Sequence, residues 1–176
     1  MNDGAYREIF EDIFGRSVEK EAIVLDTRFN GGGNLVEALT VFLSGQVYAR
    51  NVPRGQQVGV EPSQRWTKPS IVVMGEGNYS DAHCFPMAYT QLGLGETVGM
   101  PVPGTCTSVW WERLQNRDLV FGIPMVSLID MQGDVMENKQ LAPTYMVEPD
   151  PALVASGRDQ QLEKAVEVLL SKLPKR

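Results

Sequence analysis

A serine and the chain's only histidine lie three residues apart, just after a short loop that follows an apolar run at residues 71–74. If a helix begins at Ser80, the spacing places Ser80 and His83 on one helical face, within contact distance. A histidine beside a serine hydroxyl can take its proton and make the oxygen nucleophilic. The alternatives are an ordinary helix cap for Ser80 and a packed or half-exposed side chain for His83.

Three consecutive glycines, Gly31, Gly32 and Gly33, stand between another apolar run at residues 22–27 and a helical pattern that starts near Leu35. Backbone N–H groups in such a loop are uncovered by side chains and lie near the positive end of a helix dipole, which suits an anion. The anion would be a phosphate or a transient oxyanion, although neither a P-loop ending nor GxGxxG is present. The alternative is a merely tight turn.

Further candidates lie downstream. Glu137 could orient a base or polarise the serine through water, or it is simply a surface acid. Trp110 and Trp111 could line a substrate cleft, although packing in the core is the default for adjacent tryptophans. The type of residue alone does not decide between these alternatives.

The elements that must position these residues follow from periodicity. Apolar residues recur at helical spacing from an Asp3 cap to Phe14, and continuous apolar runs at 22–27 and 71–74 are typical of strands covered on both faces. Each run leads through glycines into a helix, and Pro86 would kink the second helix or shift its start. Two successive strand, glycine loop and helix units predict an α/β layered domain.

The rest of the chain gives weaker patterns. Residues 46–52 predict a short strand, and residues 53–69 are rich in Gly, Pro and Gln and predict a loop or edge. From residue 96 to 131 we expect short strands separated by loop residues that include Gly122 and Pro124. A closing helix is expected from residue 159 to 173.

Length and composition limit the classes of protein. The 176 residues, 43% hydrophobic and 22% charged, suit one domain with a real core. A net charge of −6 disfavours nucleic acid and membrane surfaces as partners, and no apolar run is long enough to span a bilayer. Cys84 and Cys106 allow at most one disulfide, and neither has metal-ligand spacing, so we expect no metal and no cofactor.

The order of the motifs resembles a known family. Residues 23–34 (IVLDTRFNGGGN), 78–82 (NYSDA), 92–95 (LGLG) and 136–138 (MEN) follow one another as in the catalytic core of the tail-specific, or C-terminal processing, serine peptidases. The resemblance is strongest to their tricorn-type branch, whose closing helix is also similar to residues 159–166. It covers nearly the whole chain.

The resemblance implies a fold, a reaction and a set of site residues. The fold would be a crotonase-like or Clp-like spiral of βαβ units with a central, largely parallel sheet and flanking helices. The reaction would be hydrolysis of internal peptide bonds in a polypeptide substrate through an acyl-enzyme on Ser80. The N–H of Asp81 and a glycine N–H from Gly32 or Gly33 would hold the oxyanion, and Glu137 matches the acid of the tricorn-type tetrad.

The general base departs from the family pattern. No Ser-Lys dyad is evident, because residues 103–106 occupy the place of the lysine. The tricorn-type base comes from an upstream Ser-His pair that residues 1–21 do not contain, which leaves His83 as the one candidate in the chain. We expect a single core domain over residues 1–176, without a PDZ module and with little or no proteolysis in isolation. A homo-oligomer or missing upstream domains would supply the base.

Two other functions stay open at this stage. One is a peptidase-like domain that binds peptides or other ligands without turnover, which the missing lysine and upstream histidine favour. The other is a crotonase-like acyl-CoA enzyme in which the glycine N–H groups hold a thioester oxyanion. Members of the family occur both in the cytoplasm and outside it, so the sequence predicts a soluble protein without fixing its compartment.

Overall fold

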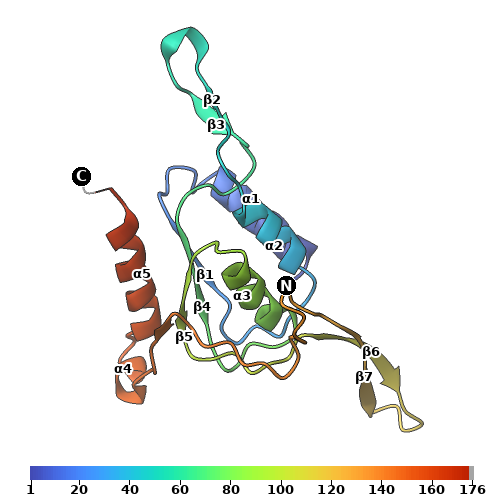
Figure 1. The fold of residues 1–176 in the computed structure, drawn as a ribbon. Helices are drawn as coiled ribbons and strands as arrows, with labels where there is room; N and C mark the ends of the chain where they lie inside the picture. Colours follow the sequence, from blue (N-terminus) through green and yellow to red (C-terminus); the bar gives the residue numbers. More distant parts are fainter. Residues whose placement is uncertain (175–176) are drawn as a thin grey trace.

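A four-stranded parallel sheet forms the centre of the computed structural model, which describes residues 1–174 (Figure 1). The strand order is β1-β4-β5-β8. The bounds are Ile23–Asp26 for β1, Ser70–Met74 for β4, Glu96–Gly99 for β5 and Tyr145–Met146 for β8. Every neighbouring pair is parallel, which confirms the α/β class and the parallel sheet.

Helices cover both faces of this sheet. On one face lie α2 (Val36–Leu43) and α3 (Asp81–Gln91), with α1 (Asp3–Phe14) packed beside α2. The other face is covered by α5 (Gln160–Lys172), which a short helix α4 (Pro151–Ala155) precedes. Figure 1 shows α5, with α4 directly below it, on the left of the sheet and α1 and α2 on the right. Parallel strands covered on both faces read as continuous apolar runs, which is why β4 was recognisable.

Strand β4 divides the core between the two layers. Val72 and Met74 pack in the cluster that contains the buried residues of α2 and α3, whereas Ile71 and Val73 pack against α5. All four side chains are almost completely buried. Because side chains alternate along a strand, one run of apolar residues fixes both layers. The point at which β4 ends is therefore fixed relative to the helices that follow it.

The first helix has the expected length but a different cap. The side chain of Asn2 accepts the N–H of Ala5, so Asn2 is the N-cap and Asp3 is the first helical residue. Aromatic side chains then join α1 to α2, with the ring centroids of Phe14 and Phe42 lying 5.9 Å apart. Asp3 still adds negative charge to the first turn, which the helix dipole favours.

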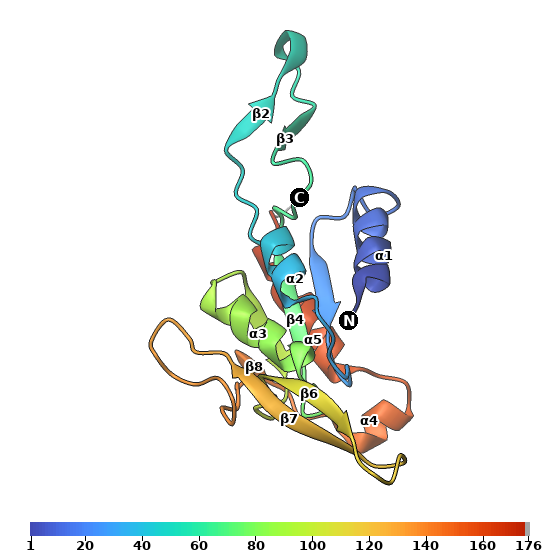
Figure 2. The same ribbon diagram turned by 90° about the vertical axis from the view of Figure 1, so that its right-hand side faces the viewer.

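Two antiparallel arms leave the body of the molecule (Figure 2). The first pairs β2 (Ala49–Asn51) with β3 (Gly59–Glu61), and a 3-10 turn (Pro53–Gly55) lies between them. Residues 53–69 were expected to be loop or edge, and β3, at residues 59–61, is an edge strand of this two-stranded sheet. The pattern did not give the bounds of this strand, because three residues are too few to show alternation.

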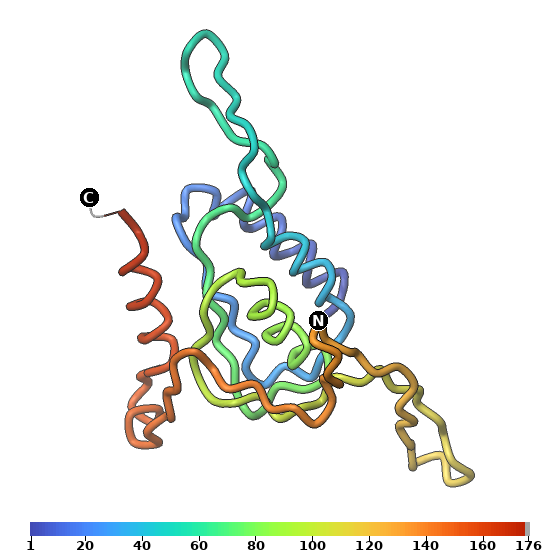
Figure 3. Tube along the Cα trace, viewed as in Figure 1, coloured from blue at the N-terminus to red at the C-terminus, as the bar shows by residue number. Residues whose placement is uncertain are grey.

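The second arm pairs β6 (Thr107–Arg113) with β7 (Val120–Ser127), and Figure 3 shows it leaving the body opposite α5. Gly122 and Pro124 were expected to separate short strands, but both lie inside β7. Pro124 pairs with Val109, where the register shifts between Ser108 and Val109. A proline fits inside a ladder at such an irregularity because no ladder N–H is needed there.

Within residues 1–174, no helix has both the length and the apolar character needed to cross a bilayer.

Candidate active site

Ser80 occupies a strained turn between β4 and α3. Its backbone has φ 54° and ψ −122°, a conformation that residues other than glycine rarely adopt. Ser80 precedes the first residue of α3, yet its side chain makes no capping hydrogen bond. The ordinary cap interpretation is therefore wrong for this serine. A serine at a sharp strand-to-helix turn has its hydroxyl lifted above the sheet, as in nucleophile elbows.

The buried side chain of Asn78 holds this turn in place. Its Nδ2 donates to Thr27 Oγ1 at 2.9 Å and to the Ala82 carbonyl at 2.8 Å, while its Oδ1 accepts the N–H of Gly75 at 3.2 Å. The Ala82 carbonyl needs such a donor because Pro86, four residues later, has no N–H. Pro86 thus lies inside α3 without ending it. The network ties the ends of β1 and β4 to the start of α3.

The glycine loop lies directly against the serine. A Cβ atom added to Gly32, whose φ is 95°, would lie 2.7 Å from Ser80 Cβ, so only glycine fits there. The carbonyl of Asn30 accepts the N–H of Tyr79, which fixes the loop to the turn. However, the Asn30 side chain also accepts the N–H of Gly32 at 2.9 Å. Of the two glycines expected to donate to an oxyanion, Gly32 is therefore already engaged, and Gly33 lines the cavity beside Ser80.

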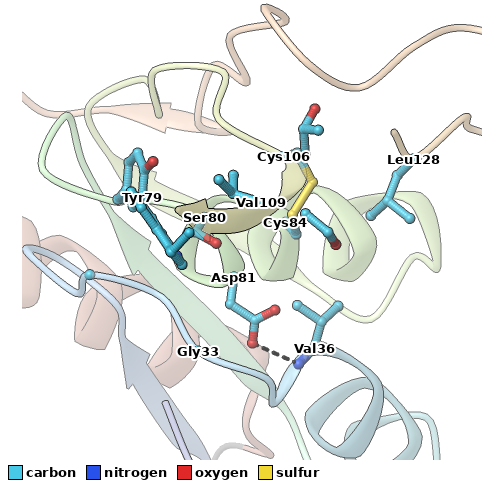
Figure 4. Close-up of a pocket in the computed structure, with 13 residues that line it drawn as sticks. Gly33, Val36, Tyr79, Ser80, Asp81, Cys84, Cys106, Val109 and Leu128 are labelled. Atoms are coloured by element: carbon cyan, nitrogen blue, oxygen red, sulfur yellow. Dashed lines mark hydrogen bonds between the residues drawn. A yellow bond between two sulfur atoms is a disulfide. The ribbon is translucent and has the colours of Figure 1, made fainter. Parts of the chain in front are cut away.

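Asp81 connects the serine to α2. Its carboxylate accepts the N–H of Leu35 and, at 3.2 Å, that of Val36, and so caps α2 from another helix (Figure 4). The sequence pattern did not predict this capping role of the Asp81 side chain. The available signal was that Leu35, at the N-cap position of α2, carries no side chain that can accept a hydrogen bond. The Asp81 N–H begins α3, directly after Ser80, and no hydrogen bond within residues 1–174 occupies it.

Residues 104–106 bring Glu137 to the serine. The N–H of Ser80 donates to Thr105 Oγ1 at 3.2 Å, and the N–H of Cys106 donates to Glu137 Oε2 at 2.7 Å. Cys106 also forms a disulfide with Cys84 of α3, with their Cα atoms 5.4 Å apart (Figure 4). The two cysteines therefore do form the one disulfide that the sequence allowed. The structure places Glu137 and Ser80 around the same hollow.

His83 lies against the loop at residues 104–106 and makes no hydrogen bond with the serine hydroxyl. Its side chain is fully buried, and Nδ1 accepts the N–H of Gly104 at 2.9 Å and that of Thr105 at 2.6 Å. Its Nε2 lies 2.8 Å from Met87 Sδ. Burial lowers the pKa of His83, and the charge of Glu137 opposes this shift. The expected contact with Ser80 is absent, and Ser80, with φ 54°, does not have the helical backbone angles that the spacing argument assumes.

The two tryptophans point in different directions. Trp111 lines the cavity beside Ser80 together with Val109, whereas Trp110 donates from Nε1 to the carboxylate of Glu112. About three fifths of each tryptophan side chain is exposed, so neither belongs to the core. Core packing, the default interpretation, is therefore wrong for both. Alternation along β6 explains the difference, because neighbouring residues face opposite sides of the arm.

Two hollows meet at Ser80. One, of about 440 Å³, lies toward the glycine loop and the disulfide, and the other, of about 360 Å³, lies toward Glu137. We call them the glycine-side hollow and the glutamate-side hollow. Both are lined by the turn and by one face of the β6–β7 arm, with five residues in common: Tyr79, Ser80, Thr107, Val109 and Trp111.

The site thus has a serine hydroxyl, backbone N–H groups and a carboxylate around one cleft. Backbone N–H groups beside a serine suit an acyl-transfer reaction, in which negative charge develops on a carbonyl oxygen. Within residues 1–174 the Ser80 hydroxyl makes no hydrogen bond, and these residues contain no cluster of three or more His, Cys, Asp or Glu suited to a metal ion. This arrangement is compatible with Ser80 as a nucleophile and with stabilisation of an anion beside it.

Comparison with known proteins agrees with this geometry. Residues 2–147 match the model of peptidase family S41. The chain is 27% identical over 157 residues to tricorn protease homolog 1 of Streptomyces coelicolor, and 24% identical over 165 residues to the tricorn protease of Thermoplasma acidophilum. These alignments cover 89% and 93% of this chain but only 15% of each relative. The chain thus spans a small part of the curated relatives that it matches.

Solved structures show the same fold. The crystal structure of the tricorn protease superposes with a TM-score of 0.76 at 24% identity, over 86% of this chain and 15% of that chain. The photosystem II D1 C-terminal processing protease superposes with a TM-score of 0.60 at 17% identity, over 96% of this chain and 44% of that chain. The fold expected from the resemblance is confirmed. The chain belongs to peptidase family S41, a family of serine peptidases, and within that family it is similar to the tricorn proteases.

Proposed function

We propose that this chain is the catalytic core of a serine endopeptidase in which Ser80 is the nucleophile. The observation that carries the proposal is the strained turn at Ser80, whose hydroxyl borders two hollows and is free of hydrogen bonds within residues 1–174. Ser80 Oγ attacks the carbonyl carbon of the scissile bond, and its proton passes through a general base to the departing amine. Water then hydrolyses the acyl-enzyme and regenerates the hydroxyl.

The oxyanion is held by two backbone N–H groups. The N–H of Asp81 lies directly after the nucleophile and at the positive end of α3, and Gly33, which lines the same hollow, would supply the second N–H. Gly32 contributes differently, because its own N–H is taken by Asn30 and its lack of a side chain lets the loop approach Ser80. Donors fixed before the reaction stabilise the developing charge without reorganising.

The general base comes from polypeptide outside these 176 residues, either from a longer chain or from another subunit. His83 is the only histidine, and its two ring nitrogens already face Gly104, Thr105 and Met87. Glu137, at the edge of the glutamate-side hollow, would orient that incoming base. The isolated chain is therefore expected to cleave weakly or not at all. This same observation favours a second candidate function, binding of peptides without turnover.

The substrate is a polypeptide cut at an internal bond. The two hollows adjoin at Ser80, one reaching the glycine loop and the other Glu137, so a substrate chain that occupies both extends beyond the scissile bond in both directions. Apolar side chains of Val109 and Trp111 line both, and Val36 lines the glycine-side hollow. A closed end next to Ser80 would instead favour removal of terminal residues.

The test is covalent labelling of Ser80 by a fluorophosphonate probe, followed by intact mass, with and without imidazole in the buffer. A small external base can substitute for a missing one in an open site, so we expect slow labelling that imidazole accelerates about tenfold or more. Ser80→Ala is the control for labelling elsewhere and must abolish the adduct. His83→Ala tests the alternative base.

Each outcome separates the candidates. Labelling of Ser80 that rises with imidazole supports an incomplete peptidase site. Labelling without imidazole that is lost in His83→Ala would make His83 the base and overturn the proposal of an external base. A wild-type chain that is never labelled, but still binds peptides, would overturn the peptidase proposal in favour of a binding domain.

A further inference from the structure

His83 has no place in the reaction proposed above, although it is a completely buried polar side chain next to the nucleophile. Buried imidazoles are uncommon and are held by specific partners. Here the partners are two consecutive backbone N–H groups, those of Gly104 and Thr105, which both point at Nδ1. The ring therefore bridges α3 and a loop that lies 21 residues further along the chain.

Two donors at Nδ1 fix the protonation state of the ring. A nitrogen that accepts two N–H groups carries no proton, so in the neutral ring the proton lies on Nε2, toward Met87 Sδ. A protonated ring would instead present an N–H at Nδ1 to the N–H groups of Gly104 and Thr105, which is repulsive. The lowered pKa of His83 agrees with a neutral ring, and Glu137 is the charged group whose field reaches it within the described residues.

The loop held by His83 carries the other contacts of the site. Thr105 Oγ1 accepts the N–H of Ser80, and the N–H of Cys106 donates to Glu137 Oε2. Gly104 has φ 104°, and its carbonyl accepts the N–H of Asn138, next to Glu137. One short loop thus touches both the nucleophile and the acid.

We propose that His83 is a positioning residue that acts through residues 104–106, holding them against α3 and thereby setting the placement of Glu137 relative to Ser80. The inference rests on the proposed function for the identity of the site, but the hydrogen bonds from Gly104 and Thr105 to Nδ1 do not depend on it. The Cys84–Cys106 disulfide joins the same loop to the same helix and acts beside His83. The disulfide ties Cys106 to α3, whereas His83 holds Gly104 and Thr105, the two residues before it.

The first test reads the hydrogen bonds directly in the intact chain labelled with nitrogen-15. Because the chain has one histidine, its two ring-nitrogen resonances are unambiguous. We expect Nδ1 at the position of an unprotonated nitrogen and Nε2 at that of a protonated one. We also expect scalar couplings through the hydrogen bonds from the amide nitrogens of Gly104 and Thr105 to Nδ1. The opposite tautomer, or the absence of both couplings, would overturn the proposal.

The second test uses a substitution that keeps the acceptor. In His83→Asn the side-chain oxygen lies close to the place of Nδ1, whereas His83→Ala and His83→Leu lack an acceptor. We expect the amides of Gly104 and Thr105 to exchange about fivefold faster or more in the Ala and Leu variants, because each lost hydrogen bond corresponds to about 1 kcal/mol. In His83→Asn exchange should stay within about threefold of wild type. Equal exchange in all three variants would contradict a positioning role.

The labelling of Ser80 separates this role from that of a base. If His83 positions the loop, imidazole-dependent labelling is retained in His83→Asn and reduced in His83→Ala and His83→Leu. If His83 were the base, His83→Asn would lose labelling as completely as His83→Ala. A wild-type chain without any labelling would defeat the proposed function, while the nitrogen couplings would still decide the role of His83.

Discussion

The backbone of Gly32 lies against the side chain of Ser80, so closely that a Cβ on Gly32 would approach Ser80 Cβ to 2.7 Å and the Tyr79 carbonyl oxygen to 2.8 Å. Both contacts involve the strained turn that holds Ser80, the proposed nucleophile. The glycine loop and the serine turn therefore form one packed unit, and movement of either displaces the other.

Gly32→Ala is expected to disrupt the site far more than the fold. The added methyl group must push the loop away from Ser80, and displacements of about 1 Å in an active site can cost about 100-fold in rate. We expect imidazole-dependent labelling of Ser80 to fall by about that factor. Gly31→Ala is the matched control, because a Cβ on Gly31 meets no atom within 4 Å. Similar losses in both variants would mean that the close approach is unimportant.

Asp81 is expected to stabilise α2 through its side chain. Asp81→Ala leaves the N–H groups of Leu35 and Val36 without their acceptor, and loss of such a cap typically costs about 1 kcal/mol. Asp81→Asn retains an oxygen acceptor. Its free energy of unfolding should fall by only a few tenths of that amount, because the variant lacks the negative charge near the positive end of the helix dipole. Urea unfolding of both variants measures the difference. An Asp81→Ala variant as stable as wild type would refute the cap.

Trp111, but not Trp110, should contribute to binding of an apolar substrate side chain. Trp111 lines both hollows at Ser80, whereas Trp110 donates to Glu112 on the other side of the arm. Burying a large apolar contact is worth about 1.5–3 kcal/mol, so Trp111→Ala should weaken a peptide boronate with a leucine side chain about 10- to 100-fold. Trp110→Ala should stay within about threefold. The reverse order of effects would place the substrate on the opposite face.

The disulfide should add stability to the whole chain. It closes a loop with a sequence separation of 22 residues, and closing a loop of that size stabilises the folded state by about 3 kcal/mol in the chain-entropy model. Cys84→Ser with Cys106→Ser should therefore lower the free energy of unfolding by about 2–4 kcal/mol. Adding a reducing agent to wild type should give a similar loss and should leave the double variant unchanged. A wild-type stability that is insensitive to reduction would contradict this contribution.

Arg28 should make stability depend on acid pH through Asp159. Its guanidinium donates to Asp26, Asp159 and Gln161, and the hydrogen bond from Arg28 lowers the pKa of Asp159. A lowered carboxyl pKa contributes stability above the unfolded value of about 3.9, and this contribution is lost as pH falls through the lowered pKa. Arg28→Met should lower the free energy of unfolding by about 1–3 kcal/mol at pH 7.

The control is the exposed pair of Arg158 and Glu163. Urea midpoints measured at pH 7, 4 and 3 should show a smaller acid-dependent loss in Asp159→Asn than in wild type, because the variant has no carboxylate to protonate. Glu163→Gln should leave the midpoint at pH 7 unchanged, since exposed ion pairs contribute little. An unchanged pH profile in Asp159→Asn would refute the assignment to Asp159.

The sequence alone predicts the central sheet and the order of the motifs. A continuous apolar run such as residues 71–74 is typical of a strand that is buried on both faces. This strand could therefore be predicted from residue type alone. The glycines at 31–33 and the serine after the next strand each follow a parallel strand. Parallel strands have their carboxyl ends at one edge of the sheet, and this edge is where Gly32 and Ser80 meet.

Tertiary structure alone decided what His83 and the tryptophans do. Helical spacing placed His83 on the face of Ser80, but spacing assumes helical backbone angles, and Ser80 has φ 54°. Its partners, Gly104 and Thr105, come from a loop whose approach depends on the whole fold. Likewise, residue type favours buried tryptophans, whereas Trp110 and Trp111 lie on an arm that leaves the core. The periodicity of the local sequence determines the type of each element. Contacts between distant segments depend on how the elements pack, and this packing determines the geometry of the site.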